Sequence, residues 1–147
     1  IKSYRALPED LEVHVNHLFE KYRKAEKDLV RYETVNTKDA EIVFVAFGTM
    51  ARIVSEVIEV LNAEGIKAGM IRPITLWPFP KAPFDELSPD KTKVVISTEL
   101  NMGQMIFDVQ LSLNGRIPVR LINRVGGIVP TTDEIVERAK KILGEIK

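Results

Sequence analysis

Cysteine is absent from this 147-residue sequence, histidine occurs only twice, and neither sign of charge is in excess. Without cysteine the chain has no thiolate ligand for zinc or an iron–sulfur cluster, no disulfide and no thiol nucleophile. Lysine plus arginine and aspartate plus glutamate number 21 each, so the basic surplus typical of nucleic-acid and anionic-membrane binders is missing. What is present, 45% hydrophobic and 29% charged residues, predicts a soluble globular protein that we expect to be cytoplasmic.

The length allows one domain, or one domain with an arm, and the sequence divides in that way at residue 40. Residues 1–40 contain no strand-like run, and we expect none to form there. Apolar residues recur at helical spacing on one stripe, and Pro8 followed by two acids suits a helix start. The stripe comprises Leu11, Val15, Leu18, Phe19, Tyr22 and Leu29. Residues 1–40 are therefore predicted to be a helical arm that docks on something else.

Residues 41–147 alternate short apolar runs with segments of helical periodicity. Gly65 ends the first helical segment, and Thr132 and Asp133 are candidate caps of the last one. This alternation predicts βαβ units, hence an α/β domain with three layers and a mainly parallel sheet. The predicted strands are 42–47, 67–72, 93–98 and 119–123, and the predicted helices are 53–61, 84–87, 102–113 and 132–146.

Right-handed crossovers place all strand-to-helix loops at one edge of such a sheet, where α/β proteins bind ligands and partners. One of these loops is the turn Gly48–Thr49, whose N–H groups could meet an anion at the following helix. The turn lacks the glycine spacing of a dinucleotide loop and the lysine of a P-loop. A tight turn with Thr49 as N-cap explains it fully, and we favour that interpretation over anion binding. The loops are 48–50, 72–80, 99–104 and 124–130.

Two polar groups offer catalytic or ligand candidates, each with a structural alternative. Glu99, Asn101 and Gln104 follow the third strand, and they either bind at the sheet edge or cap the next helix. Glu99 is a weak acid–base candidate, since no second carboxylate stands at a telling spacing. His14 and His17 are three residues apart, as two metal ligands could be, but no further pair accompanies them. We expect them to be ordinary surface histidines.

Arg72 and Arg124 stand at loop-bearing strand ends and could clamp a carboxylate or phosphate, although pairing with a nearby acid is an equal alternative. The proline-rich stretch from Pro73 to Pro83 contains four prolines and carries Trp77 and Phe79. A stiff loop with large apolar side chains suits a domain or subunit interface. In the alternative, Trp77 folds under the loop and covers the chain's own core. We favour the interface.

Five segments in order resemble the α subunit of the 2-oxoacid:ferredoxin oxidoreductases, especially the 2-oxoglutarate and branched-chain 2-oxoacid branches. The resemblance covers nearly the whole chain, and the nine-residue proline segment makes it specific. The segments are LEVHVNHLFEKYRKA at 11–25, AFGTMAR at 46–52, RPITLWPFP at 72–80, STELNMGQM at 97–105 and GGIVPTTDEI at 126–135.

This resemblance implies the C-terminal piece of that subunit, with a fold like the transketolase C-terminal domain. The family's enzymes decarboxylate a 2-oxoacid oxidatively with coenzyme A and reduce ferredoxin, and among substrates we favour 2-oxoglutarate. Thiamine pyrophosphate, Mg²⁺ and iron–sulfur clusters are expected in the β subunit, the α subunit's N-terminal domain or a ferredoxin-like subunit. No catalytic residue carries over to this chain, which we expect to bind no cofactor and to be inactive alone. Phe107 is a departure, since relatives would carry an acid there.

The role left for this piece is assembly with the N-terminal domain and the β subunit, or forming one wall of the catalytic cleft. The predicted contact-edge residues are Thr49, Arg72, Trp77, Phe79, Asn101, Gln104 and Arg124. One alternative is a stand-alone α/β module that binds a small anion or nucleotide at the Gly48 and Gly103 loops. Another is a structural domain that dimerises through the arm and the proline-rich loop.

Overall fold

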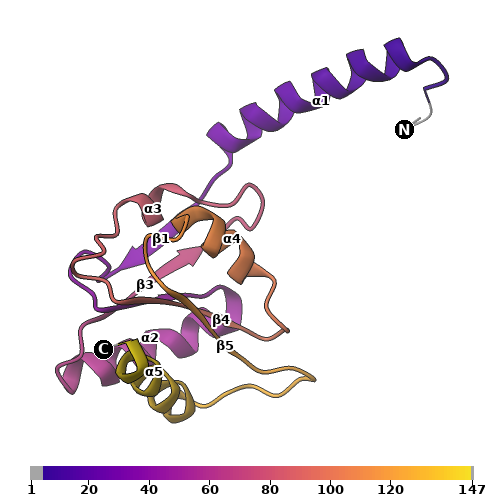
Figure 1. Ribbon diagram of the computed structural model, residues 1–147. Coiled ribbons are helices and arrows are strands. Elements are labelled where there is room, and N and C mark those ends of the chain that lie inside the picture. The colour runs from indigo at the N-terminus through magenta and orange to yellow at the C-terminus, as the bar shows by residue number, and fades with distance from the viewer. Residues whose placement is uncertain (1–4, 147) are drawn as a thin grey trace.

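A computed structural model describes residues 5–146, so residues 1–4 of the predicted arm and residue 147 of the predicted domain lie outside it. A helix projects from an α/β domain whose sheet is sandwiched between helices (Figure 1). The elements are α1 (Pro8–Asp28), β1 (Tyr32–Val35), β2 (Ile42–Val45), α2 (Gly48–Ala63), β3 (Ala68–Pro73), α3 (Ala82–Asp85), β4 (Val94–Glu99), α4 (Met105–Leu113), β5 (Val119–Asn123) and α5 (Thr132–Ile146).

The five strands form one sheet in the order β1-β3-β2-β4-β5. Strands β2 to β5 are parallel, and only β1 runs antiparallel, against β3. Helices α2 and α5 cover one face, while α3 and α4 cover the other (Figure 1). The predicted three-layer, mainly parallel α/β fold is therefore confirmed, and the bounds predicted for β5 and α5 are those observed.

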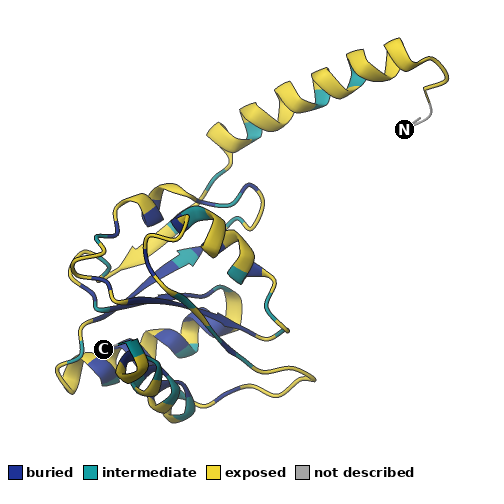
Figure 2. Ribbon diagram, viewed as in Figure 1, coloured by how far each residue is buried: buried dark blue, intermediate teal, exposed yellow. Residues whose placement is uncertain are grey.

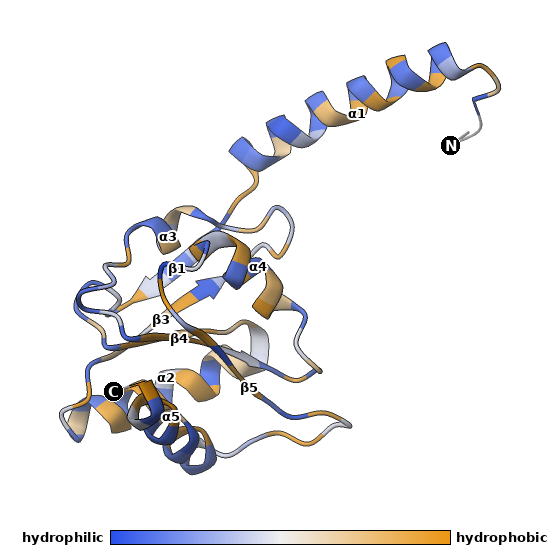
Figure 3. Ribbon diagram, viewed as in Figure 1, coloured by the Kyte–Doolittle hydropathy of each residue, from blue (hydrophilic) through white to orange (hydrophobic). Residues whose placement is uncertain are grey.

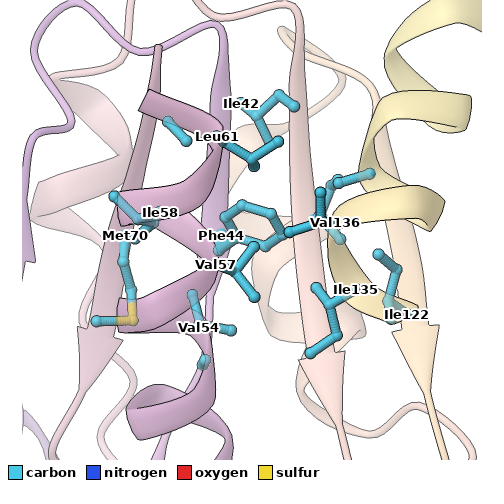
Figure 4. Packing of buried hydrophobic residues seen from close by; sticks show 14 of the residues in the cluster. Ile42, Phe44, Val54, Val57, Ile58, Leu61, Met70, Ile122, Ile135 and Val136 are labelled. Atoms are coloured by element: carbon cyan, nitrogen blue, oxygen red, sulfur yellow. The ribbon is translucent and has the colours of Figure 1, made fainter. Parts of the chain in front are cut away.

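Each face of the sheet carries its own hydrophobic core, because every residue of β2 is buried. Alternate side chains of β2 point to opposite faces. Phe44 packs with α2 and α5, whereas Val43 and Val45 pack with α3 and α4. Figure 4 shows Phe44 between the side chains of α2 and those of α5. An uninterrupted apolar strand thus predicts a sheet covered on both sides.

The expectation that residues 1–40 contain no strand is wrong. Residues 32–35 form β1, in which Tyr32 lies opposite Pro73 and Val35 opposite Met70. Three of its four residues are exposed, so the segment contains no apolar run that would mark it as a strand. Its pairing with β3 supplies the hydrogen bonds, and this tertiary context is invisible in the local sequence. The proposed division at residue 40 thus assigns one sheet strand to the arm.

Helix α1 stands away from the domain, and none of its residues is buried (Figure 2). Its apolar residues Leu11, Val15, Leu18 and Tyr22 follow one another at intervals of four, three and four, the spacing of a helix-packing seam. Figure 3 shows the resulting alternation of hydrophobic and hydrophilic bands along α1. Near the domain the Tyr22 ring meets that of Trp77 edge to face, with 5.4 Å between centroids. Most of the seam nevertheless lacks a partner within the described chain.

Two predicted helix caps are wrong. Helix α2 begins at Gly48, after Phe47, so Thr49 lies inside its first turn and makes no side-chain cap. At α5 the N–H of Glu134 donates to the hydroxyl of Thr131 at 3.2 Å, rather than to Thr132 or Asp133. In both places the cap is displaced by one or two residues, which is the usual uncertainty of a helix end. None of the helices within residues 5–146 has the length and apolarity needed to cross a membrane.

Candidate functional site

A pocket of about 180 Å³ opens at the carboxyl edge of the parallel strands. We call it the strand-edge pocket. Three of the four predicted loops or their flanks meet in it, whereas loop 124–130 contributes no lining residue. Topology explains the convergence, because parallel strands deliver their following loops to one edge. The lining residues are Phe47, Leu76, Phe79, Glu99, Asn101, Gln104, Met105 and Asp108.

Glu99 is the most buried polar group of the pocket, with 1% of its surface exposed. Its Oε2 accepts hydrogen bonds from the N–H groups of Gln104 (2.8 Å) and Met105 (2.9 Å). Its Oε1 accepts from the Ile106 N–H (3.0 Å) and the Ser97 hydroxyl (2.8 Å). Burial raises the pKa of Glu99, but hydrogen bonds from Gln104, Met105, Ser97 and Asn101 outweigh it and lower the pKa below the ordinary 4.5.

The carboxylate of Glu99 therefore acts as the N-terminal cap of α4. A helix N-terminus has unpaired N–H groups and a partial positive charge, and here an anion of the chain itself satisfies them. Both oxygens already accept two hydrogen bonds, and the low pKa keeps the proton off. The residues after β4 were predicted either to bind at the sheet edge or to cap the next helix. Glu99 caps the helix, which disfavours an acid–base role for it.

The turn between Glu99 and α4 is held by its own polar groups. Asn101 Oδ1 accepts from the Gly103 N–H at 2.7 Å, and Asn123 Nδ2 donates to the Asn101 carbonyl at 2.7 Å. Gly103 has φ +96°, a conformation that glycine adopts without strain. This turn delays the start of α4 to Met105, three residues after the predicted start. Gln104 stays exposed at the pocket mouth.

The two aromatic residues of the proline loop, residues 73–83, have different surroundings. Phe79 is half-buried and stacks on Phe84, with 5.7 Å between ring centroids, so it covers the domain's own core. Trp77 keeps 60% of its surface exposed and touches Tyr22 of α1. The alternative of folding under the loop thus describes Phe79, whereas Trp77 is displayed as the interface prediction requires.

Both candidate arginines are paired within the chain. Arg72 donates to Glu33 of β1 at 2.9 Å, and Arg124 donates to Glu134 of α5 at 2.8 Å. The hydrogen bond from Arg124 holds the pKa of Glu134 below its usual value. Neither arginine lines the strand-edge pocket. Their geometry corresponds to the structural alternative, since each joins two neighbouring elements.

The remaining candidates lie away from the pocket. Thr49 is exposed in the first turn of α2 and is no lining residue. His14 and His17 line a shallow hollow on α1 beside Asp10. Within residues 5–146 no three His, Cys, Asp or Glu residues come close enough to hold a metal ion together. The interpretation of both histidines as surface residues fits these positions.

Sequence reasoning missed several residues that shape the strand-edge pocket. Phe47 and Met105 were predicted only as parts of a strand and a helix, and Leu76 only as part of the proline loop. Asp108 was predicted only as part of the helix 102–113, although a carboxylate one turn into α4 could have been placed at the sheet edge. The signal was available for Asp108, because α4 starts at that edge.

The pocket's charges decide which ligands it suits. Its ionisable lining residues are Glu99 and Asp108, and no cationic side chain lines it. A phosphate or carboxylate ligand would meet two like charges, which disfavours the alternative of a small-anion or nucleotide module. The same lining does not fit the pyrophosphate of thiamine pyrophosphate, and a chain without cysteine supplies no thiolate to an iron–sulfur cluster. We therefore derive no chemical step through either group here.

A hollow of about 370 Å³ lies at the opposite edge of the sheet, beside Asn62 and Asp39. Asn62 accepts from the Ala68 N–H and donates to the Ala68 carbonyl, while Asp39 is paired with Lys91. Asn62 thus joins α2 to β3, and the Asp39–Lys91 pair joins the loop before β2 to the loop before β4. Lys38 and Lys67 also line the hollow, and their charges lie near the Asp39 carboxylate.

The order of the layers and strands defines an α/β fold that is also found in a transketolase. A split-gene transketolase has this fold, with a TM-score of 0.62 and 22% identity over 80% of this chain and 42% of that chain. The sequence then gives the family: residues 40–135 match the pyruvate:ferredoxin oxidoreductase core domain II, and the chain belongs to that family.

Two longer relatives cover nearly the whole chain. Ketoisovalerate oxidoreductase subunit VorB of Methanothermobacter marburgensis is 39% identical over 93% of this chain. The 2-oxoglutarate:ferredoxin oxidoreductase of Magnetococcus marinus, solved with 2-oxoglutarate, coenzyme A and succinyl-CoA bound, superposes with a TM-score of 0.79 and 26% identity over 95% of this chain. The chain spans 38% of the first relative and 24% of the second.

Proposed function

We propose that this chain is a domain of the α subunit of a 2-oxoacid:ferredoxin oxidoreductase that serves assembly and forms one wall of the cleft. The whole enzyme would decarboxylate a 2-oxoacid oxidatively with coenzyme A and pass the electrons to ferredoxin. Its thiamine pyrophosphate, Mg²⁺ and iron–sulfur clusters would be bound by the N-terminal domain, the β subunit or a ferredoxin-like subunit. Family membership supports the reaction class, and the engaged polar groups of the strand-edge pocket support a non-catalytic role.

The observation that carries the assembly role is the unburied apolar seam of α1. Solvated leucine, valine and aromatic side chains at packing intervals indicate a helix that is covered in the complete protein. The Magnetococcus marinus enzyme supports the assembly role. Its superposition covers 95% of this chain, an extent that must include most of α1. That chain is about four times as long as this one. The N-terminal domain of the same subunit is the partner we propose for α1.

The substrate follows from two conflicting indications. The resemblance in sequence favoured 2-oxoglutarate, the substrate bound in the Magnetococcus marinus enzyme. Identity to VorB, named for ketoisovalerate (2-oxoisovalerate), is 39%, against 32% to 2-oxoglutarate synthase subunit KorA of the same organism over an equal number of residues. We propose a 2-oxoacid of one of these two kinds and give the branched-chain acid precedence.

The test is an assay of the full-length parent polypeptide, co-expressed with its neighbouring subunits. Coenzyme A-dependent reduction of a viologen dye is measured with 2-oxoisovalerate and with 2-oxoglutarate, each with thiamine pyrophosphate and Mg²⁺. We expect reduction with 2-oxoisovalerate and a lower rate with 2-oxoglutarate. A faster reaction with 2-oxoglutarate would reverse the order of substrates. No reduction with either acid, from a folded complex loaded with clusters, would exclude both substrates, and the same result with further 2-oxoacids would contradict the reaction class.

The two arginines supply a second test, of the site residues themselves. Because Arg72 and Arg124 are engaged with Glu33 and Glu134, replacing either by alanine is expected to change KM for the 2-oxoacid by less than about twofold. A residue that clamped the substrate carboxylate would instead raise KM tenfold or more when removed. Arg52, an exposed arginine of α2, serves as the matched control for the substitution. A large rise in KM for either variant alone would restore the clamp hypothesis.

A further inference from the structure

A second hollow of about 390 Å³ adjoins the strand-edge pocket. Phe79 and Asp108 line both hollows, so we treat the two as one surface and call it the α4 groove. The second hollow reaches the end of α1 through Glu26 and the following Val30. Its lining residues are Glu26, Val30, Trp77, Pro78, Phe79, Lys81, Ala82, Asp108 and Leu111.

The α4 groove carries a net negative charge. Its ionisable lining residues are three acids, Glu26, Glu99 and Asp108, and one base, Lys81. Glu99 is buried and ionised. The carboxylate of Asp108 forms no ion pair with any of residues 5–146. By charge complementarity the groove suits an occupant with a cationic side chain and disfavours an anionic one.

Large apolar side chains lie in this acidic groove and beside it. Phe107 and Leu111 lie one turn apart on α4, with 68% and 70% of their surfaces exposed, and Trp77 adds its exposed ring. Figure 3 shows the hydrophobic residues along α4. Exposed aromatic and aliphatic groups around a few polar ones are typical of the centre of a protein interface. The aromatic faces of Trp77 and Phe79 are suited to stack a guanidinium or cover the stem of a lysine.

We infer that the α4 groove receives an arginine- or lysine-bearing segment from the part of the same polypeptide that lies outside these 147 residues. The inference rests on the proposed assembly role and names its second contact. Tyr22 of α1 touches Trp77, and Glu26 of α1 lines the groove. A domain that packs along α1 therefore also reaches the groove. The relatives have that additional length, because this chain spans 38% of VorB. The cation binds Asp108, and the apolar rim excludes water around the pair.

Photo-crosslinking in the assembled full-length enzyme tests the occupant. The photoreactive residue p-benzoylphenylalanine replaces Phe107 or Leu111, and mass spectrometry identifies the attached peptide. We expect attachment to a segment of the same polypeptide, outside these 147 residues, that contains arginine or lysine. The control replaces Glu59, an exposed residue of α2 on the opposite layer, and is expected to give no attachment to that segment.

Every other result overturns the inference. Attachment to a different subunit shows that the occupant is not the same polypeptide, and attachment to a segment without basic residues removes the charge argument. Absence of attachment from both positions leaves the groove without an occupant. Crosslinking needs no substrate, so this result is independent of the viologen assay, and failure of either experiment is distinguishable from failure of the other.

Charge reversal then tests the role of Asp108. We expect Asp108→Lys to lower the crosslinking yield from Leu111 by at least about fivefold, because the cation of the occupant meets a like charge. Asp108→Glu keeps the charge and is expected to retain most of the yield. Glu59→Lys makes the same change of charge on the opposite layer and should leave the yield unaltered. Equal yields from Asp108→Lys and from the unaltered protein would refute a cationic anchor.

Discussion

Replacing Glu99 by alanine is expected to destabilise the domain by about 3–5 kcal/mol. The substitution removes the acceptor of four hydrogen bonds, three from the backbone N–H groups of Gln104, Met105 and Ile106. These donors lie at the start of α4 beneath the strand-edge pocket, where leaving them unpaired is costly. The loss of an anion from the positive end of the helix adds to the effect. Urea denaturation followed by circular dichroism measures the change in free energy of unfolding.

Two further variants make this result specific. Glu99→Gln keeps the size of the side chain but places an NH₂ group where only acceptors fit, so we expect it to be destabilised nearly as much as the alanine variant. Glu59→Ala removes an exposed glutamate from α2 and should change the free energy of unfolding by less than about 0.5 kcal/mol. If Glu99→Ala were no more destabilised than Glu59→Ala, the capping role of Glu99 would be wrong.

Glu99 also makes stability depend on pH in a defined direction. The pKa of Glu99 is lower in the folded than in the unfolded protein, so the folded state favours the ionised form. This contribution is fully present above the unfolded pKa and is lost as the pH falls through the folded pKa. We expect the unaltered protein to lose stability below about pH 5, and Glu99→Gln to show a shallower loss. Parallel pH profiles for the two would contradict the lowered pKa.

The second large effect is expected for Gly69→Ala in β3. A Cβ at Gly69 would lie 2.6 Å from the carbonyl oxygen of Asn36 and 2.7 Å from that of Val35. Both atoms belong to the backbone, so the end of β1 has to move as a unit. We expect a destabilisation of about 3 kcal/mol, as for overpacking that displaces backbone. Accelerated hydrogen exchange should be confined first to β1, because β1 is the element displaced.

Gly144→Ala is a matched control with the opposite expected sign. Gly144 lies on the exposed side of α5, and a Cβ there meets no atom within 4 Å. Alanine favours the helix over glycine, so this variant should gain about 0.5–1 kcal/mol. Thermal unfolding of both variants measures the contrast. Equal midpoints would show that β1 yields to the added methyl group at no cost, which would contradict a tight approach at Gly69.

Local sequence signals sufficed for the parallel part of the fold. Strand β2 is apolar throughout and β4 begins with three apolar residues, while α5 alternates apolar and charged residues over four turns, so these patterns predict their elements directly. Strand β1 has no such signal, because its YETV sequence is exposed on an edge and forms only against β3. Pattern reasoning detects elements that bury their own side chains and misses those held by backbone pairing.

The sequence predicted where the site lies better than it predicted what each residue does there. Loop positions correctly brought Phe79, Asn101 and Gln104 to one edge of the sheet, since topology alone fixes that edge. Whether Glu99 caps a helix or faces a ligand depends on a turn of five residues whose geometry no spacing rule gives. The pairing of Arg72 with Glu33 was equally hidden, because Glu33 belongs to the strand that the sequence did not show.

Strand β1 also has a consequence for handling the domain as a separate fragment. It covers the outer edge of β3, whose Met70 and Ile71 are buried in the two cores. A truncation that starts at Glu41, the apparent beginning of the α/β repeat, would bare the N–H and C=O groups along that edge. Bare edges recruit strands from other molecules and promote aggregation. A fragment that starts before Tyr32 keeps its own protective strand, and we expect it to stay monodisperse in solution.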